Sequence, residues 1–332
     1  MGGPASAVTD GVTIGPDGGT IRPRCLAGAA RPSSAVPLEP AASPLMNVHL
    51  IHVPYDSGHR AVRMGAGPVH FAANGAADRM RAAGHAVDER WIERDQTLRG
   101  EIESAFELDR LLAGAVAAAR DGGALPIVLA GNCITSLGTV SGLGATDLGV
   151  VWFDAHPDLH TPESTTSGFL DGMALSLLMG RCWHEMAATV PGALPIASYR
   201  IAMVGVRDVD PGEQAPLLAE GGIARVLVED VRRLGAAAAL APALDALARE
   251  VRRVYVHLDL DVHDSVDAPV NAFRTPPGLL RSEVRDAVRA IVARFEIAGA
   301  ALTAYDPSVD PDGRTLEAGI ALMLELAAGR VA

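Results

Sequence analysis

The chain has 332 residues, a mass of 34.4 kDa, a net charge of −12 and 49% hydrophobic residues. This hydrophobic content is enough for a buried core and excludes a chain that is disordered throughout. The acidic balance disfavours nucleic acid and anionic membranes as partners, because both repel negative charge.

Residues 1–45 differ in composition from everything after them. They contain seven Pro and seven Gly and show no apolar period of 2 or 3.6 residues. Such a segment buries too little apolar surface to offset its ordering entropy. We expect residues 1–45 to be disordered or an incorrectly assigned beginning of the chain, and residues 46–332 to form a single domain.

Short apolar runs alternate with helix-length segments from residue 47 onward. The expected strands are Val48–Val53, His85–Trp91, Leu125–Ala130, Gly149–Phe153, Ile201–Val206, Ala224–Val228, Val254–Leu260 and Ala300–Ala304. The expected helices include Val69–Ala83, Leu108–Arg120, Ala236–Val251 and Ser282–Phe295. Apolar strands that are each followed by a helix predict an α/β fold with a mostly parallel sheet covered on both faces.

Export and membrane signals are not apparent in the sequence. No apolar run approaches the ~18 residues that span a bilayer, and no basic stretch followed by an apolar one marks a secretory signal. The three cysteines, Cys25, Cys133 and Cys182, are too few and too scattered for a disulfide framework. We therefore expect a cytoplasmic protein that does not associate with membranes. The sequence carries no information on its oligomeric state.

Two clusters of carboxylates follow apolar strands directly. The first cluster, Asp154, His156 and Asp158, follows the fourth expected strand, and the second, Asp259 and Asp261, ends the seventh. In parallel sheets, ligands bind beyond the carboxyl ends of the strands. One such motif alone is typical of a surface turn. Two of them at strand ends favour a site for Mn²⁺ or a similar divalent ion, because buried carboxylates require neutralising cations.

These motifs resemble those of the ureohydrolase family, the arginases and agmatinases, over about residues 47–330. The matching segments are Pro54–Gly58 with Gly65 and Gly67-Pro68, Asp154–Asp158 (D-A-H-x-D), Gly205–Glu213, and His257, Asp259, Asp261 and Asp264 (S-x-D-x-D-x-x-D). The resemblance implies a three-layer α/β/α arginase-like fold with a mainly parallel eight-stranded sheet. It also implies that residues 46–332 form one catalytic domain.

By the same resemblance, the site holds two Mn²⁺ ions per chain. The implied ligands are Cys133, Asp154, His156, Asp158, Asp259 and Asp261. Asp154 and Asp259 would bridge the ions. His156 and Asp261 would complete the coordination of one ion, and Asp158 would bind the other. Asp158 is also the expected catalytic residue, accepting a proton from the tetrahedral intermediate and passing it to the leaving amine.

Cys133 stands where the family has a histidine ligand. The family turn G-G-D-H-S reads Ala130-Gly131-Asn132-Cys133-Ile134 here. A nearby divalent cation would convert the thiol into a thiolate ligand. The other interpretation is a small buried hydrophobic residue at a degenerated site. We favour the ligand, because the remaining ligands are all present.

Two further departures concern the substrate's guanidino group. Asp171 occupies the position of the arginase proton-shuttling His, and Ala304 occupies that of the acid that holds the guanidinium. The positions that hold the substrate's amino and carboxylate groups are retained. They are Thr165, Ser167, Asp208, Asp210 and Glu213, with His160 replacing an Asn.

This combination resembles the hydrolases of Nω-hydroxy-L-arginine found in antibiotic biosynthesis. It implies a dimanganese amidinohydrolase in which a metal-bridging hydroxide attacks a small-molecule guanidino amino acid, releasing hydroxyurea and L-ornithine. An ordinary arginase or another guanidino-amino-acid hydrolase is the alternative among enzymes. From another class, a non-catalytic amino-acid-binding module on an arginase scaffold would also explain the lost residues.

Overall fold

The computed structural model describes residues 1–2, 45–94, 100–210, 218 and 222–329. The chain divides into two units, residues 1–42 and 43–332, and all elements below belong to the second. The expected disordered segment, residues 1–45, lies outside the described residues except at its ends. We propose that residues 46–332 form the single catalytic domain.

Eight parallel strands form one sheet, as the sequence predicts. In spatial order they are β4 (Ala86–Trp91), β1 (Asn47–Val53), β5 (Leu125–Ala130), β10 (Glu296–Thr303), β9 (Arg253–Asp259), β6 (Leu148–Phe153), β7 (Ile201–Val204) and β8 (Ala224–Val226). A short antiparallel pair, β2 (Tyr55–Asp56) and β3 (His59–Arg60), lies outside this sheet. The four central strands β5, β10, β9 and β6 carry the site at their carboxyl ends.

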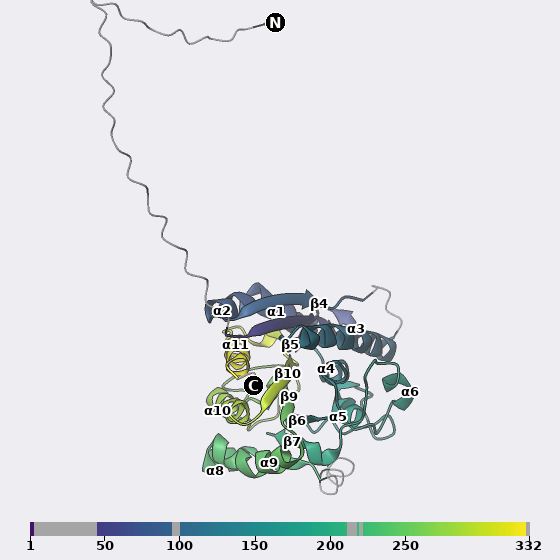
Figure 1. Ribbon diagram of the computed structural model, residues 1–332, viewed down its shortest axis with the longest axis vertical. Helices are drawn as coiled ribbons and strands as arrows, with labels where there is room; N and C mark the ends of the chain where they lie inside the picture. Colours follow the sequence, from purple (N-terminus) through teal and green to yellow (C-terminus); the bar gives the residue numbers. More distant parts are fainter. Residues whose placement is uncertain (3–44, 95–99, 211–217, 219–221, 330–332) are drawn as a thin grey trace, which may run out of the picture. The chain divides into compact units, whose positions relative to one another are not determined.

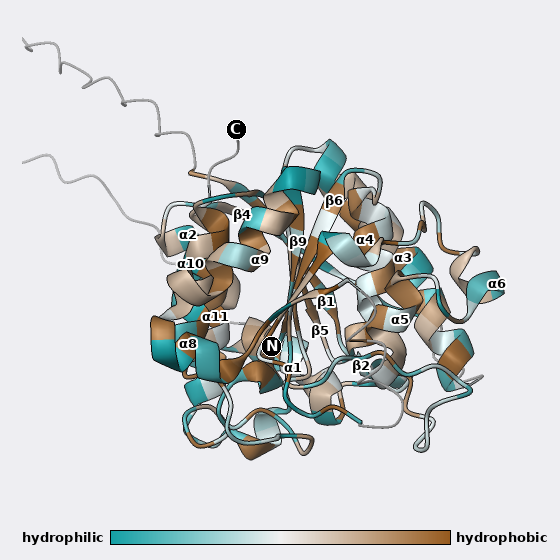
Figure 2. Ribbon diagram, turned by 90° about the horizontal axis from the view of Figure 1, so that it is seen from below, coloured by the Kyte–Doolittle hydropathy of each residue, from teal (hydrophilic) through white to brown (hydrophobic). Residues whose placement is uncertain are grey.

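Helices cover both faces of the sheet and give three layers (Figures 1 and 2). On one side lie α2 (Ala76–Ala82), α8 (Val228–Leu234), α9 (Ala236–Glu250), α10 (Arg281–Val292) and α11 (Arg314–Ala327). On the other lie α3 (Glu101–Asp121), α4 (Ser136–Leu143), α5 (Ala174–Leu178) and α6 (His184–Ala187). Helix α1 (Ala66–Ala73) follows the β2–β3 pair. The α/β/α arrangement predicted from the sequence is confirmed.

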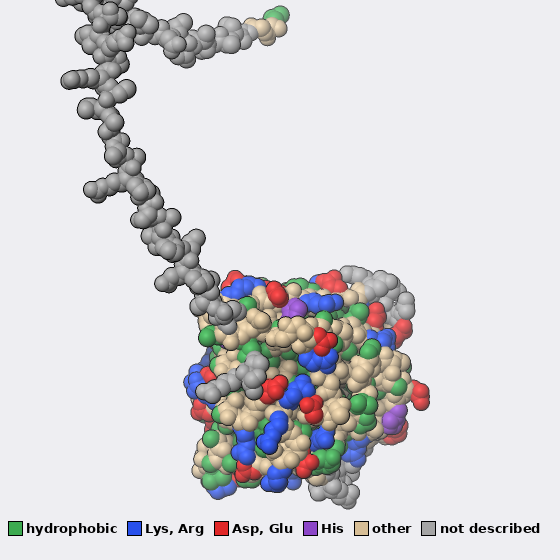
Figure 3. Space-filling model, viewed as in Figure 1, with side chains coloured by type: hydrophobic (Ala, Val, Ile, Leu, Met, Phe, Trp, Pro, Cys, Tyr) green, Lys and Arg blue, Asp and Glu red, His purple; other side chains and the backbone are tan. Residues whose placement is uncertain are grey.

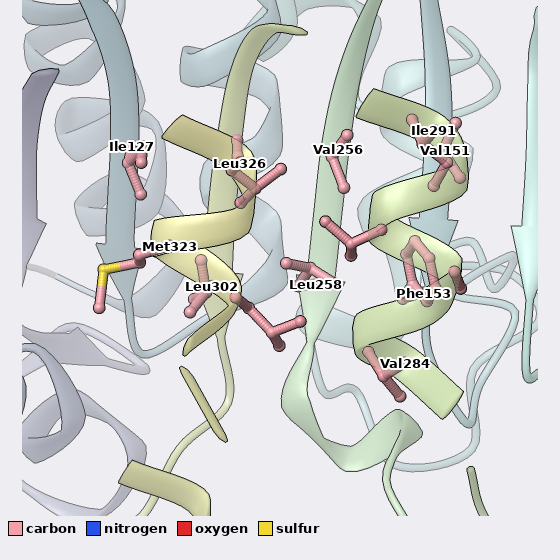
Figure 4. Packing of buried hydrophobic residues seen from close by; sticks show 14 of the residues in the cluster. Ile127, Val151, Phe153, Val256, Leu258, Val284, Ile291, Leu302, Met323 and Leu326 are labelled. Atoms are coloured by element: carbon pink, nitrogen blue, oxygen red, sulfur yellow. The ribbon is translucent and has the colours of Figure 1, made fainter. Parts of the chain in front are cut away.

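The core consists of two hydrophobic clusters, one on each face of the sheet. Because successive strand residues point to opposite faces, β6 gives Val151 and Phe153 to one cluster and Val150 and Trp152 to the other. Figure 4 shows Val151 and Phe153 packed with side chains of α10. Burial on both faces explains why these strands are apolar at every position.

Several element boundaries differ from the predicted ones. The helix expected over Val69–Ala83 is two helices, because the chain turns at Gly75 with a φ of 73°. Val228 begins α8 instead of ending a strand, and β10 begins at Glu296 instead of Ala300. Helix α11 was not predicted.

Charged side chains of both signs are interspersed on the face shown in Figure 3. The ion pair Arg79–Glu317, which is bidentate, joins the neighbouring helices α2 and α11. Among the described helices, none has both the length and the apolar composition to cross a membrane.

Candidate metal centre and substrate cavity

The predicted metal ligands lie together at the carboxyl edge of the sheet. Each follows or ends one of three strands: Cys133 comes after β5, Asp259 ends β9, and Asp154 follows β6. A cavity of about 460 Å³ opens above them. Its lining includes Cys133, His156, Asp158, Asp259 and Asp261, the predicted substrate contacts His160, Asp208 and Asp210, and also Met64, Phe169, Asp171, Asn271, Phe273 and Ala304.

Two groups of potential ligands share one carboxylate. Cys133, Asp154 and Asp259 form one group, and Asp154, His156 and Asp261 form the other, with donor atoms in each group within 4.8 Å of one another. Cys133 Sγ lies 2.9 Å from Asp259 Oδ2. His156 Nδ1 lies 3.3 Å from both Asp154 Oδ1 and Asp261 Oδ2. Two neighbouring groups with a shared carboxylate fit a pair of cations.

Hydrogen bonds fix the orientation of these carboxylates. Asp154 accepts the Trp152 indole N–H at Oδ2 (3.0 Å) and the His156 backbone N–H at Oδ1 (2.7 Å). Asp259 Oδ1 accepts the Asp261 backbone N–H (2.8 Å), and Asp261 Oδ1 accepts that of Ala155 (3.2 Å). Each carboxylate keeps further lone pairs, which a metal ligand requires.

Asp158 lies beside both groups in a strained conformation. Its backbone has a φ of 51°, which is uncommon for a residue with a side chain. The residue is 5% exposed, and its Oδ2 is a buried atom with no hydrogen-bond partner among the described residues. A buried carboxylate oxygen without a donor is costly. A bound cation would supply the missing interaction.

The electrostatics of the cluster also fit cations. Burial raises the pKa of Asp154 to about 6 and that of Asp259 well above its usual value. Burial and the surrounding carboxylates likewise raise the pKa of Cys133 far above the ordinary value of a thiol. For His156, burial lowers the pKa, but Asp261 and Asp154 outweigh this and raise it to about 12. Without cations the cluster retains protons, and divalent ions would displace them.

Replacing Cys133 tests whether its thiolate binds metal. Cys133 is 2% exposed, and its Sγ lies within hydrogen-bond distance of Asp259 Oδ2 and of Thr303 Oγ1 (3.1 Å). We expect Cys133→Ser to lower the metal content from two ions to one per chain, and Cys133→His to retain both. Elemental analysis of purified variants gives the count. Full occupancy in the serine variant would show that Cys133 only packs.

The predicted substrate contacts are only partly brought to the cavity. His160, Asp208 and Asp210 line it, whereas Thr165 and Ser167 lie on the neighbouring loop, with their hydroxyl oxygens 3.4 Å apart. Glu213 lies outside the described residues.

Asp208 is held near the predicted ligand His156, whose Nε2 lies 3.8 Å from Asp208 Oδ2. Its Oδ2 accepts the Thr275 hydroxyl (2.7 Å). The adjacent Arg207 guanidinium donates to the backbone carbonyls of Thr275, Gly205 and Asp261. These contacts join the segment after β7 to the segment after β9.

Sequence reasoning missed several residues around the site. Trp152 stacks on His257, with ring centroids 3.6 Å apart, and this buried pair lies beneath Asp154. The alternation of strand residues could have placed Trp152 there, two positions before the ligand. Phe169 and Phe273 both line the cavity and stack on each other, with ring centroids 5.3 Å apart. They come from loops far apart in sequence, so no local pattern marks them.

The parallel α/β sheet and the paired ligand groups at its carboxyl edge define a metal-dependent enzyme. Comparison with known proteins is more specific. The model of the Arginase family matches residues 46–329. The arginase of Bacillus caldovelox is 28% identical over 291 residues, which cover 83% of this chain and 96% of that protein. Its crystal structure superposes with a TM-score of 0.78 at 26% identity, covering 86% of this chain and 100% of that one.

The chain belongs to the arginase family. It is therefore a metal-dependent hydrolase that acts on C–N bonds of linear amidines. The structure of the agmatine ureohydrolase of Thermoplasma volcanium has the same fold at 21% identity, with a TM-score of 0.62 and coverage of 87% of this chain and 90% of that one.

Proposed function

We propose that this protein hydrolyses Nω-hydroxy-L-arginine to L-ornithine and hydroxyurea, with two Mn²⁺ ions, in antibiotic biosynthesis. The observation that carries the proposal is a cavity beside two groups of potential metal ligands, with Ala304 lining it where the resemblance to arginases places an acid. The metal chemistry is thus retained while recognition of the guanidino group is changed.

The metal-holding residues of the proposal are the six that the sequence indicates. They are Cys133, Asp154, His156, Asp158, Asp259 and Asp261. A pair of divalent cations supplies a water of lowered pKa as the nucleophile for a carbon that resists attack at neutral pH. A soft thiolate among hard oxygen ligands lowers the selectivity for Mn²⁺ and admits Zn²⁺.

Asp158 is the proposed proton carrier of the reaction. Its unpartnered Oδ2 is buried next to the ligand groups, and burial together with Asp154 and Asp171 raises the pKa of its carboxyl. A carboxylate beside the reacting groups can act as a general base and then as a general acid. In the proposed reaction one carboxylate oxygen of Asp158 would hold a cation, and the other would accept a proton from the tetrahedral intermediate and give it to the substrate nitrogen that leaves as the amine of ornithine.

The alanine at position 304 favours a less basic substrate. Arginine presents a permanently charged guanidinium, and Ala304 offers it no counter-charge. In an Nω-hydroxyguanidine the oxygen withdraws electron density and lowers the basicity. Such a group requires less cationic stabilisation when it binds. Asp208 and Asp210 also line the cavity, and they are the proposed contacts of the substrate's α-amino group.

Two other functions remain as alternatives. An ordinary arginase is favoured by the relatives named above, which are arginases. A non-catalytic amino-acid-binding module is favoured by the altered guanidino end, and a metal content of no more than one ion per chain would support it.

Identifying the products tests the proposal. The Mn²⁺-loaded enzyme incubated with Nω-hydroxy-L-arginine is expected to release hydroxyurea and L-ornithine in equal amounts, measured by mass spectrometry. The same protein after removal of metal by a chelator is the control and is expected to release neither. No hydroxyurea from a protein that holds two ions would contradict the proposal.

A further inference from the structure

The carboxyl group of Asp171 lines the cavity from the side of the Cys133 turn. Asp171 is 7% exposed and begins a short 3₁₀ helix, Asp171–Met173. Its Oδ1 accepts the Ile134 backbone N–H (3.0 Å), and its Oδ2 accepts the Asn132 side-chain amide (2.6 Å). The two donors come from the residues on either side of Cys133. Asp171 is thereby fixed at the edge of the metal centre.

Asn132 is fixed in turn, so the orientation of its amide is determined. Its Oδ1 accepts the Ser57 backbone N–H (2.8 Å), which leaves its amino group directed at Asp171. A carboxylate at position 132 would lie at hydrogen-bond distance from that of Asp171 and repel it. The amide at 132 and the acid at 171 are therefore compatible as a pair.

Asp171 is the one buried acid among the described cavity-lining residues that is assigned neither to metal binding nor to the amino-acid part of the substrate. Among the described cavity-lining acids, Asp158, Asp259 and Asp261 belong to the metal centre, and Asp208 and Asp210 are the proposed contacts of the substrate's α-amino group. A carboxylate accepts about four hydrogen bonds, and Asp171 accepts two from the protein. Both of its oxygens retain the capacity to accept a donor from the cavity.

The position of Asp171 relative to its neighbours indicates which part of a substrate it meets. The Cys133 turn lies on one side of it, and on the other the adjacent Gly172 carbonyl accepts the His160 backbone N–H (2.9 Å). The guanidino end of a substrate must lie beside the metal ligands for attack on its carbon. Asp171 is at that end, where Ala304 presents only a methyl group.

We propose that Asp171 accepts hydrogen bonds from the N–H and O–H groups of the substrate's hydroxyguanidine head. This inference rests on the proposed function of the same site. The substrate's hydroxyl is a donor directed at a fixed carboxylate, and a charged acceptor roughly doubles the strength of such a bond. Asp171 then supplies an acceptor that Ala304 does not provide.

Exchanging the two partners gives a matched variant. In Asn132→Asp/Asp171→Asn the hydrogen bond between positions 132 and 171 is retained with its direction reversed, and the net charge is unchanged. Asn132 is not among the described residues that line the cavity. The exchange therefore moves the carboxylate from a position that lines the cavity to one that does not. The single variant Asp171→Asn provides a second test if the exchanged pair does not fold.

Inhibition by two fragments of the substrate tests whether Asp171 contacts the hydroxyguanidine head. N-hydroxyguanidine represents the head and L-ornithine the tail, and each is used as a competitive inhibitor of the Mn²⁺-loaded enzyme. Both variants are expected to weaken inhibition by N-hydroxyguanidine at least ~10-fold. Inhibition by L-ornithine and the metal content are expected to stay unchanged.

The outcomes separate this inference from the proposed function. An inhibition constant for N-hydroxyguanidine that stays within about twofold of the wild-type value would overturn the role of Asp171. Parallel losses of ornithine inhibition and of metal would also overturn it, and would show that Asp171 only holds the Cys133 turn. If the wild-type enzyme prefers arginine, the proposed function is wrong. Inhibition by the two fragments can then be measured with arginine as the substrate, and this still tests the contact with Asp171.

Discussion

Replacing Asp154 by Asn is expected to remove both metal ions and to lower turnover on the order of 1,000-fold. Asp154 belongs to both ligand groups, whereas every other residue of these groups belongs to one. An amide has the shape of the carboxylate but lacks the charge that a bridging position requires. Loss of a catalytic metal removes several kcal/mol of transition-state stabilisation, which corresponds to a rate factor of about 1,000.

Metal content and turnover of the Asp154→Asn protein are measured together. Asp121→Asn is the matched control, because Asp121 is exposed and pairs only with its neighbour Arg120 in the described structure. The control is expected to hold two ions and to keep full activity. Two ions in the Asp154→Asn protein would show that the carboxylate is not shared between them.

The same variant has a second expected effect in metal-free protein. Burial raises the pKa of Asp154 to about 6 in the folded state, against about 4 in an unfolded chain. The folded state therefore binds more protons between these values, and its stability falls as the pH rises through them. We expect the metal-free Asp154→Asn protein to have a thermal midpoint at pH 7 no lower than that of the metal-free wild type.

Replacing Trp152 by Ala is expected to destabilise the protein by about 3–5 kcal/mol. Trp152 is fully buried, stacks on His257 and fills the layer of the core directly beneath Asp154. Its removal leaves a cavity between the sheet and the α3–α5 side. Urea denaturation of metal-free protein measures the loss without the contribution of bound ions.

The variant Trp152→Phe separates packing from the hydrogen bond to Asp154. It keeps a ring against His257 but lacks the indole N–H that Asp154 Oδ2 accepts. We expect a smaller loss of stability together with weaker metal binding. Phe153→Leu, on the opposite face of the same strand, is the control and should cost about 1 kcal/mol without changing metal affinity. Unchanged metal affinity in Trp152→Phe would contradict an orienting role for the indole.

The sequence predicted the sheet and the metal cluster for one physical reason. Strands buried on both faces are apolar throughout, so polar residues that follow them mark the carboxyl edge of a parallel sheet. Asp154 and Asp259 were found in this way and lie on neighbouring strands, β6 and β9. Cys133 could be placed beside them only by resemblance, because strand β10, which lies between β5 and β9, comes last in the sequence.

Contacts between distant loops could not be predicted. The bond from Asn132 to Asp171 joins a turn after β5 to a turn before α5, and neither residue has a local pattern that identifies its partner. The stacking of Phe169 on Phe273 has the same origin. The substrate-facing wall is built from such loop contacts, whereas the ligands are fixed by strand ends. Specificity is therefore harder to predict from sequence than metal binding.

The most direct test of the proposed function is a side-by-side assay of L-ornithine release from Nω-hydroxy-L-arginine and from L-arginine by the Mn²⁺-loaded enzyme. The absence of an acid at Ala304 is expected to penalise the fully charged guanidinium of arginine more than the less basic hydroxyguanidine. We predict a kcat/KM for Nω-hydroxy-L-arginine at least ~100-fold above that for L-arginine, a difference of about 2.7 kcal/mol in barrier. Equal or faster turnover of L-arginine would contradict the assignment and identify the protein as an ordinary arginase.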